Sequence, residues 1–197
     1  GVMCAVFMAR YCPARLYKVL RPAVDLLAGI PSVVYGFFGL VVIVPAVRQL
    51  FGGGKSVFTA ALLLAIMILP TIISISEAAL RSVPQSYYEG ALALGATKER
   101  AIFGVSLPAA RSGVSAGIIL GIGRAIGETT AIVMIAGNQP IIPNSIFSGV
   151  RTLTTNIILE MGYAQDLHRE ALIATAAVLF IFVLLINLLF SALKKTS

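Results

Sequence analysis

The chain has 197 residues, of which 58% are hydrophobic and only 12% are charged, about half the charged share of a typical soluble domain. This balance excludes a disordered chain and argues against an ordinary water-soluble domain. The 15 Lys and Arg against 8 Asp and Glu fit the basic cytoplasmic loops of a membrane protein better than a nucleic-acid surface. We therefore expect no nucleic acid as a partner. Cys4 and Cys12 lack the spacing of a metal site or of a disulfide framework, so we expect no bound metal either.

Three stretches without any charged residue are long enough to cross a membrane. They are Leu26–Val47, Ser56–Ser76 and Ala171–Leu193, with 22, 21 and 23 residues, and a helix needs roughly 20 apolar residues to cross a bilayer core of about 30 Å. A fourth stretch, Ser112–Ala136, is apolar except for two charges in its middle. We therefore predict an all-α, polytopic membrane protein with complete spans at 25–47, 57–76, 112–136 and 171–193.

The chain opens on an uncharged apolar run, Gly1–Ala9, which gives only about 14 Å of helix. No basic region precedes this run, as a secretory signal peptide would require. We interpret it as the end of an earlier helix. The prediction is one transmembrane domain over 1–197 that is incomplete at its N-terminus.

The distribution of Lys and Arg predicts the orientation in the membrane. Ten of them fall in the segments 10–21 and 81–111 and at the C-terminus, whereas the alternate loops hold only Arg48, Lys55, Arg151 and Arg169. Cytoplasmic loops carry the excess of positive charge. We therefore expect the segment 77–111 and the C-terminus to face the cytoplasm.

The polar segment Glu77–Arg111 begins with features of a short helix rather than of a plain connector. Pro84 suits a helix start, where its missing N–H has no partner to lose. Good helix formers follow over Gln85–Leu94, and Gly95 comes where a helix end favours positive φ. This part predicts a helix that ends in a glycine bend.

A second short helix is predicted over Lys98–Val105. Thr97 precedes it as a plausible N-cap, and Pro108 prevents the helix from continuing unbroken into the next span. The segment therefore predicts two short helices that are bent at a glycine and project from the membrane on its cytoplasmic side.

A spaced motif in this segment resembles the EAA loop of bacterial ABC importer permeases. It runs from Glu89-Gly-Ala-Leu-Ala-Leu-Gly95 through nine residues to Val105-Ser-Leu107-Pro108, with Gly90 in place of an Ala and Val105 in place of an Ile. The resemblance implies a type I permease fold and a loop that docks on an ATP-binding subunit and transmits its closure. The implied coupling residues are Glu89, Ala91, Gly95, Val105, Leu107 and Pro108.

Arg124 and Glu128 are the most informative polar residues, because they lie in the middle of the span 112–136. In a continuous helix their i,i+4 spacing places them on one face. Gly113, Gly117 and Gly121 fall on that same face at 100° per residue, and such small residues let another helix approach closely. The pair is thus expected to face protein or a central pathway, away from lipid.

Two roles for this pair remain open from the residues alone. Arg124 and Glu128 can form an internal salt bridge that only fixes helix packing. Alternatively, the planar fork of donors on Arg124 can bind an oxyanion such as phosphate or sulfate, with Glu128 holding the guanidinium between cargo ions. Thr129 and Thr130 add hydroxyl groups directly after the pair.

Two further stretches resemble the permeases of the bacterial high-affinity phosphate (Pst) importer. They are Ala28-Gly-Ile-Pro-Ser-Val-Val-Tyr-Gly-Phe-Phe-Gly39 and Gly123-Arg-Ala-Ile-Gly-Glu-Thr-Thr130, and the segments around Ala136–Asn138, Arg151–Thr154 and His168–Leu172 are closer to the PstC subunit than to PstA. The resemblance implies translocation of phosphate across the cytoplasmic membrane of a bacterium or archaeon. The residues implied in translocation are Arg124, Glu128, Thr129 and Thr130.

The same resemblance implies the partners of the chain. They are a second, PstA-like permease, a dimer of PstB-like ATP-binding subunits, an external phosphate-binding protein and membrane lipid. The chain itself lacks the Gly-x4-Gly-Lys-Ser/Thr pattern that cradles ATP phosphates, so we expect no catalytic residue and no cofactor of its own. A permease for sulfate, molybdate or another small solute, a secondary transporter or channel gated by Arg124–Glu128, and a structural scaffold remain alternatives.

Overall fold

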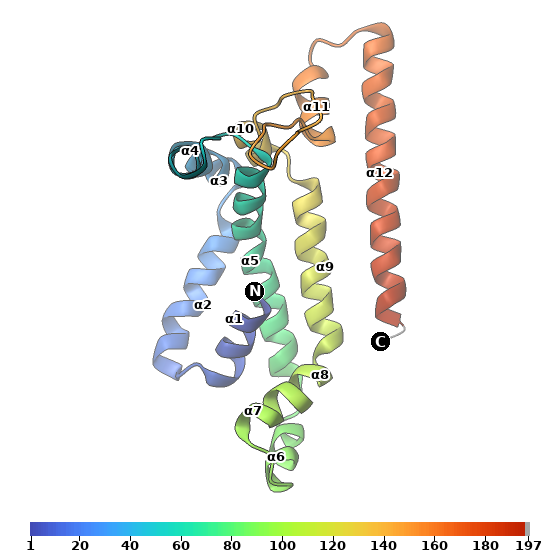
Figure 1. The fold of residues 1–197 in the computed structure, drawn as a ribbon. Coiled ribbons are helices and arrows are strands. Elements are labelled where there is room, and N and C mark those ends of the chain that lie inside the picture. The colour runs from blue at the N-terminus through green and yellow to red at the C-terminus, as the bar shows by residue number, and fades with distance from the viewer. Residues whose placement is uncertain (196–197) are drawn as a thin grey trace. The chain divides into compact units, whose positions relative to one another are not determined.

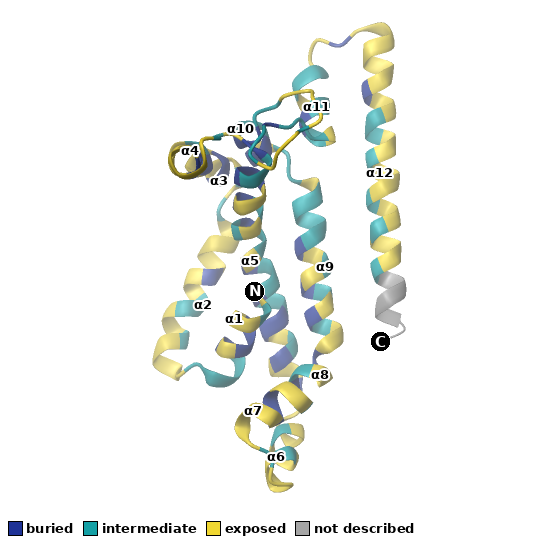
Figure 2. Cartoon of the chain, in the orientation of Figure 1, coloured by how far each residue is buried: buried dark blue, intermediate teal, exposed yellow. Residues whose placement is uncertain are grey.

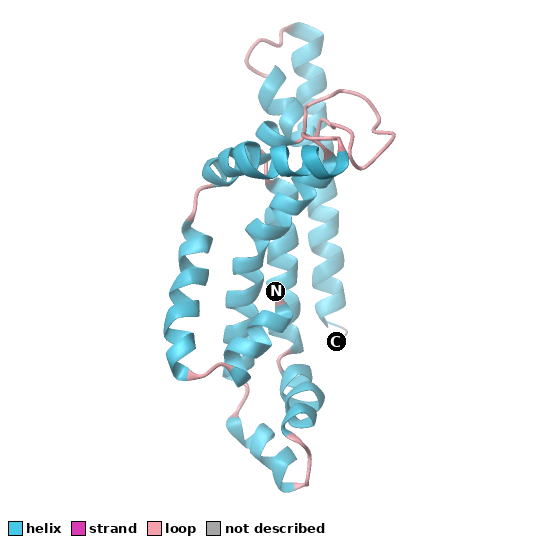
Figure 3. Cartoon of the chain, turned by 60° about the vertical axis from the view of Figure 1, so that its left-hand side comes forward, coloured by secondary structure: helices cyan, strands magenta, loops and turns pink. Residues whose placement is uncertain are grey.

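The structure, a computed structural model, describes residues 1–195, with side chains described for residues 1–190 (Figure 1). These residues form helices joined by loops (Figure 3), and an isolated bridge between Gly137 and Val150 is the β-type pairing among them. The chain divides into two compact units. The first unit contains residues 1–29, 68–122 and 190–197, and the second contains residues 30–67 and 123–189.

The first unit is built around the second half of the long helix α5 (Val57–Ser82). The other helices of this unit are α1 (Val2–Val6), α2 (Ala14–Gly29), α6 (Gln85–Ala93), α7 (Lys98–Ala101), α8 (Leu107–Ala109) and α9 (Arg111–Gly127, as far as residue 122). Two π-helical turns, Phe7–Tyr11 and Ile102–Ser106, continue α1 and α7. A core of buried apolar side chains joins these elements and contains Ala5, Val6, Leu80, Val83, Ile102, Ala110 and Val114.

The second unit is built around the first half of α5. Its helices are α3 (Ser32–Phe38), α4 (Val44–Phe51), α10 (Thr130–Ile135), α11 (Leu153–Glu160) and α12 (Asp166–Lys195, as far as residue 189), and a π-helical turn, Gly39–Ile43, joins α3 to α4. The core of this unit is formed mainly by α3, α4, α5 and α10, with Tyr35, Ile43, Leu63, Met67, Ile132 and Ile135 among its buried residues. By contrast, α12 is largely exposed over residues 166–189 (Figure 2).

Within the part of the chain that the structure describes, three helical stretches are long and apolar enough to cross a membrane: Ser32–Phe51, Val57–Ser82 and Asp166–Phe190. A fourth candidate is the pair Lys98–Ala109 and Arg111–Gly127, which is bent by 68°. The prediction of an all-helical polytopic fold is therefore confirmed. The boundaries differ from the predicted ones in ways that follow from particular residues.

The first span begins at Ser32, and the prediction of a start near Asp25 was wrong. The chain breaks at Ile30 and Pro31, since a residue before proline avoids the helical region. Residues 25–29 instead belong to α2. The second span continues past Glu77 to Ser82, because ion pairs neutralise the Glu77 carboxylate on both sides.

The continuous helix predicted over Ser112–Ala136 was also wrong. Helix α9 ends at Gly127 and α10 begins at Thr130. The carboxylate of Glu128 accepts a hydrogen bond of 3.0 Å from the backbone N–H of Ala131. A side-chain oxygen that satisfies an early N–H of a helix stabilises the helix start, so Glu128 favours a new helix here over continuation of α9.

The loop Gly137–Val150 folds back on the start of α5 within the second unit. The backbone N–H groups of Val57 and Phe58 donate to the carbonyls of Ser148 and Ile146, at 3.1 and 2.8 Å. Three aromatic rings close the contact, with Phe51 stacked on Phe147 at 5.0 Å between centroids and Phe58 packed against both. The predicted short helix near 152–161 is confirmed as α11, which Thr152 caps through a 3.3 Å bond from the N–H of Thr155.

Candidate functional site

The helices α6 and α7 form the predicted pair with a glycine bend between them. Helix α6 ends at Ala93, and Gly95 has a φ of +84°, a conformation that L side chains adopt only with strain. The hydroxyl of Thr97 accepts a 3.3 Å hydrogen bond from the N–H of Arg100 at the start of α7. These three details of the local prediction are confirmed.

The break between this helix pair and the next span comes later than the sequence indicated. Pro108 lies inside α8 near its start, where a missing N–H is tolerated. The chain turns at Ala110, between α8 and α9, and this turn accounts for the 68° bend. Helices α6 and α7 lie at one end of the first unit (Figure 1).

The six residues that match the EAA pattern differ in exposure. Glu89, Gly95 and Pro108 are exposed, whereas Ala91, Val105 and Leu107 are half-buried. Leu107 packs against the core of the first unit, and Leu94, next to the glycine bend, has 92% of its surface exposed. The segment therefore presents a carboxylate and a large apolar side chain outward while its other end is anchored in the core.

The three glycines of α9 that were predicted to share one face, Gly113, Gly117 and Gly121, lie against α5 within the first unit. A Cβ added at Gly113 would overlap the Cβ of Ala79, one at Gly117 would lie 3.2 Å from Cβ of Ile75, and one at Gly121 would lie 2.8 Å from Ile72 Cγ1. Real Cβ atoms essentially never lie within 3.0 Å of such a neighbour, so a larger side chain at Gly113 or Gly121 would require the facing part of α5 to shift.

In the second unit, glycines of the first stretch that resembles Pst permeases pack against α10, the helix that begins at the last residue of the second stretch, Thr130. A Cβ at Gly36 of α3 would lie 2.8 Å from Cα of Ala131 in α10, and one at Gly39 would lie 3.2 Å from a methyl group of Ile135. The Arg124 guanidinium lies within electrostatic range of the Tyr35 hydroxyl. The glycines of the first motif thus allow a close approach to α10, the helix that follows the second motif.

The structure does not place Arg124 and Glu128 in the same helix. Arg124 lies on α9 and is half-buried, whereas Glu128 lies beyond the end of that helix. The argument that both residues share one helical face therefore does not hold for Glu128. Thr129 precedes the first residue of α10 and donates from its hydroxyl to the carbonyl of Gly127 at 3.3 Å, and Thr130 is exposed.

Glu128 also lines a cavity of about 310 Å³ in the second unit. The wall is mostly apolar, from α5, α9 and α10, and Thr152 and Thr154 add hydroxyl groups from the start of α11. A carboxylate and two hydroxyls in an apolar wall can orient a small polar solute. This cavity was not predicted, because it depends on how the loop before α11 folds back on α5.

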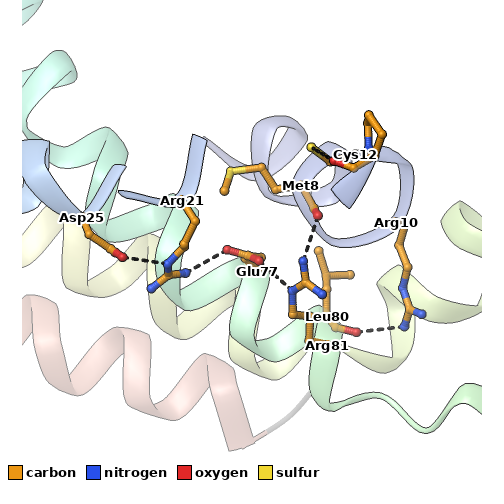
Figure 4. A network of polar contacts seen from close by, with 9 residues as sticks. Met8, Arg10, Cys12, Arg21, Asp25, Glu77, Leu80 and Arg81 are labelled. Carbon is orange, nitrogen blue, oxygen red and sulfur yellow. Dashed lines mark hydrogen bonds and ion pairs between the residues drawn. The ribbon is translucent and has the colours of Figure 1, made fainter. Parts of the chain in front are cut away.

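A second polar cluster, in the first unit, was missed at the sequence level. Glu77 is 1% exposed, and its two carboxylate oxygens bind Arg21 of α2 at 2.8 Å and Arg81 of α5 at 2.6 Å (Figure 4). Arg21 also binds Asp25 at 3.0 Å. The signal in the sequence was a lone Glu at the end of an apolar span with Arg at i+4.

This geometry defines an all-helical, multi-pass membrane protein, with a bent helix pair at one end of its first unit and glycines of the Tyr35–Gly39 stretch packed against α10 in its second unit. The sequence profile of the family described as "Binding-protein-dependent transport system inner membrane component" matches residues 1–196. The chain belongs to this family, whose members are membrane components without catalytic activity of their own.

Curated relatives give a finer comparison. The chain is 43% identical over 202 residues to "Probable ABC transporter permease protein YqgH" of Bacillus subtilis. This match covers 98% of this chain and 65% of that protein. It is 35% identical to "Phosphate transport system permease protein PstC" of Mesorhizobium japonicum and of Haemophilus influenzae, over 94% of this chain in both cases and over 64% and 65% of those proteins. The chain thus spans slightly less than two thirds of these relatives.

Solved structures support the same fold. A chain from the inward-facing MetNI methionine ABC transporter matches 100% of this chain and 85% of its own length, with a TM-score of 0.78 and 21% sequence identity. A chain from an amino acid ABC transporter matches with a TM-score of 0.64 and 20% identity. At these identities the likeness concerns the fold alone.

Proposed function

We propose that the chain is the PstC-like permease subunit of an ATP-driven importer that moves inorganic phosphate across the cytoplasmic membrane. The observation that carries the proposal is the packing of Gly36 and Gly39 of the first Pst-like stretch against α10, because α10 begins at Thr130, the last residue of the second Pst-like stretch. The identity of 35% to proteins named PstC supports phosphate as the cargo. A solute such as sulfate or molybdate is the alternative that a transport assay must distinguish.

In this proposal Arg124 binds the anion during passage. Its guanidinium offers paired donors that match two oxygens of phosphate. Glu128 caps α10 and so fixes the helix that packs on the Tyr35–Gly39 stretch. Thr129 and Thr130 lie at the same helix start and provide hydroxyl groups to the pathway.

The helices α6 and α7 serve in this proposal as the contact with an ATP-binding subunit on the cytoplasmic side. Exposed Glu89 and Leu94 would meet that subunit, and the anchored residues Val105 and Leu107 would pass its movement to the membrane helices. The other partners are a second, PstA-like permease and an external phosphate-binding protein. The ATP-binding subunits, which are PstB-like, supply the hydrolysis.

Radiolabelled phosphate uptake by the assembled transporter tests the role of Arg124. If Arg124 binds the anion, Arg124→Lys assembles normally but takes up much less phosphate, because a point charge does not reproduce the planar fork of donors. The double variant Arg124→Met with Glu128→Gln also assembles and fails to import. The glutamine keeps an oxygen that can accept the Ala131 hydrogen bond, so Glu128→Gln alone is milder.

Competition identifies the cargo, since excess unlabelled sulfate or molybdate should leave uptake unchanged while unlabelled phosphate abolishes it. Wild-type uptake by the double variant would reduce Arg124 and Glu128 to structural residues. Equal competition by sulfate would replace phosphate with a broader oxyanion cargo.

A further inference from the structure

Glu77 is the most deeply buried charged residue among the described side chains that is not part of the proposed translocation site. Its side chain is 1% exposed, whereas those of its partners Arg21 and Arg81 are 35% and 46% exposed. A buried carboxylate needs charged partners in close contact, because water cannot compensate its charge. Glu77 therefore holds two arginines from different parts of the chain at fixed positions.

Helix α2 contacts the rest of the first unit through this cluster and through a small apolar core, against which Tyr17 and Leu20 of α2 also pack. Of the residues of α2, Val24 alone is buried, in a small core with Met8 and Ile73. The Arg21–Glu77 ion pair joins residues 56 positions apart and connects α2 to α5. The guanidinium of Arg81 also lies 4.5 Å from the ring centre of Tyr17 on α2, so α5 contacts α2 through both arginines.

The same cluster continues into the turn before α2 (Figure 4). Arg81 donates to the backbone carbonyl of Met8 at 3.1 Å. Arg10 donates to the carbonyl of Leu80 at 2.9 Å and to the side chain of Gln85, the first residue of α6, at 3.3 Å. The turn is thereby attached to the last turn of α5 and to the start of the bent helix pair.

A further contact reaches α7, the second helix of that pair. The ammonium group of Lys98 lies 4.8 Å from the ring centre of Tyr11, an attractive cation–π arrangement. Tyr11 also packs against the core that contains Leu80 and Ile102. The turn 10–12 therefore contacts the first residues of both α6 and α7.

We propose that Glu77 is a positioning residue that makes α2, the turn 10–12 and the helices α6 and α7 move as one body during the transport cycle. Movement of the helix pair then reaches α2 through side-chain contacts, in addition to its direct connection to α5 and α9. The inference rests on the proposed docking of α6 and α7 on an ATP-binding subunit. It adds a second route by which that docking acts on the membrane helices.

Spin-label distances in the assembled transporter test this link. Labels at Lys18 of α2 and Ser86 of α6, both exposed, are introduced after Cys4 and Cys12 are replaced by Ser. In the nucleotide-free and vanadate-trapped states the Lys18–Ser86 distance should change by no more than about 2 Å, the size of small helix shifts. A reference pair, from Ser86 to the matching segment of the second permease subunit, should change clearly.

The variant Glu77→Gln removes the charge and keeps a side chain of similar size. We expect its Lys18–Ser86 distance to change between the two states. Phosphate imported per ATP hydrolysed should fall about 2- to 30-fold, the range seen for residues that carry coupling. Asp25→Asn is the matched control, because Asp25 pairs with Arg21 within α2 only, and it should preserve both readouts.

The outcomes distinguish failure of the link, the joint movement of α2 with α6 and α7 through Glu77, from failure of the proposed function. A Lys18–Ser86 distance that changes in the wild-type transporter would overturn the link, whether or not Glu77→Gln assembles. An assembled Glu77→Gln variant with the wild-type ratio of import to hydrolysis would also overturn it and leave Glu77 a merely structural residue. A reference distance that does not respond to nucleotide would contradict the proposed coupling to ATP hydrolysis itself.

Discussion

Glu160 shows how single residues hold the corner between α11 and α12. Its carboxylate accepts hydrogen bonds from the Tyr163 hydroxyl and from Arg151, the latter at 2.6 Å. The Tyr163 hydrogen bond, together with Arg151, lowers the pKa of Glu160 below its ordinary value of 4.5. Arg151 also donates to the carbonyl of Asn138 at 3.1 Å, so one carboxylate connects the loop before α11 to the corner after it.

The lowered pKa predicts a pH-dependent stability difference between the wild type and Glu160→Gln. A group with a depressed folded-state pKa stabilises the protein above its unfolded pKa and loses that effect as the pH falls through the folded value. The wild type should therefore melt at a higher temperature than the variant at neutral pH. This difference in melting temperature should narrow as the pH drops below about 4.5.

Thermal unfolding of the detergent-solubilised protein across this pH range measures this difference. Glu170→Gln, which removes an exposed carboxylate on α12, is the control and should show no comparable narrowing. A difference for Glu160→Gln that persists unchanged at low pH would mean that its charge contributes nothing to the corner.

Gly36 supports a second prediction at this scale. In Gly36→Ala the new Cβ would meet the backbone of Ala131 at 2.8 Å and Met134 Sδ at 2.9 Å. Overpacking of this kind costs about 1–3 kcal/mol, so the melting temperature should fall. Gly29→Ala is the control, since nothing lies within 4 Å of its Cβ. Equal melting temperatures for the two variants would contradict the close approach of α3 and α10.

At the scale of elements, the bend between α6 and α7 depends on one backbone conformation. Gly90 and Gly95 lie in the same segment, and a Cβ at either position would meet nothing within 4 Å. They differ in that only Gly95 has positive φ, at +84°. Alanine at Gly95 therefore costs roughly 1–2 kcal/mol of backbone strain, whereas alanine at Gly90, within α6, favours the helix.

The two alanine variants should differ in coupling. Gly95→Ala should keep normal membrane levels but import less phosphate per ATP hydrolysed, because the strained bend reorients α6 against its partner. Gly90→Ala should behave as wild type. Phosphate import and ATP hydrolysis are both measured in proteoliposomes that contain the assembled transporter. Equal ratios of import to hydrolysis for the two variants would remove the bend from the coupling mechanism.

The elements that could be predicted from sequence are those set by local signals. The glycine bend at Gly95 and the caps at Thr97 and Thr152 are examples, because each depends on residues within one turn of helix. The end of α9 was missed because Glu128 was assigned to the middle of a span, although a carboxylate three residues before Ala131 can also start a helix.

The contacts of Glu77 could not be predicted, because they depend on tertiary packing. No spacing rule relates Arg21 to a residue 56 positions away, and the cavity beside Glu128 requires the fold of a distant loop. Motif resemblance identified the stretch that contains Gly36 and Gly39, without indicating that these glycines allow its close contact with α10. The resemblance thus identified the residues of this stretch, and the structure shows how they pack.

At the scale of the whole molecule, the proposed function requires α6 and α7 on the side of the membrane opposite to α11. Single cysteines at Lys98, next to the bend, and at Arg169, at the start of α12, test this requirement in a permease otherwise free of Cys. Both side chains are exposed. The positive-inside rule predicts Lys98 in the cytoplasm and Arg169 outside.

A membrane-impermeant thiol reagent added to intact cells or spheroplasts should therefore label the cysteine at Arg169 and leave that at Lys98 unlabelled. Inside-out vesicles should give the reverse pattern. A third cysteine at Leu62, a residue of the α5 span, is the control for membrane protection and should react slowly from both sides. Labelling of Lys98 and Arg169 from the same side would contradict the predicted topology, because an ATP-binding subunit could then not reach α6 and α7 while a binding protein reached the opposite loops.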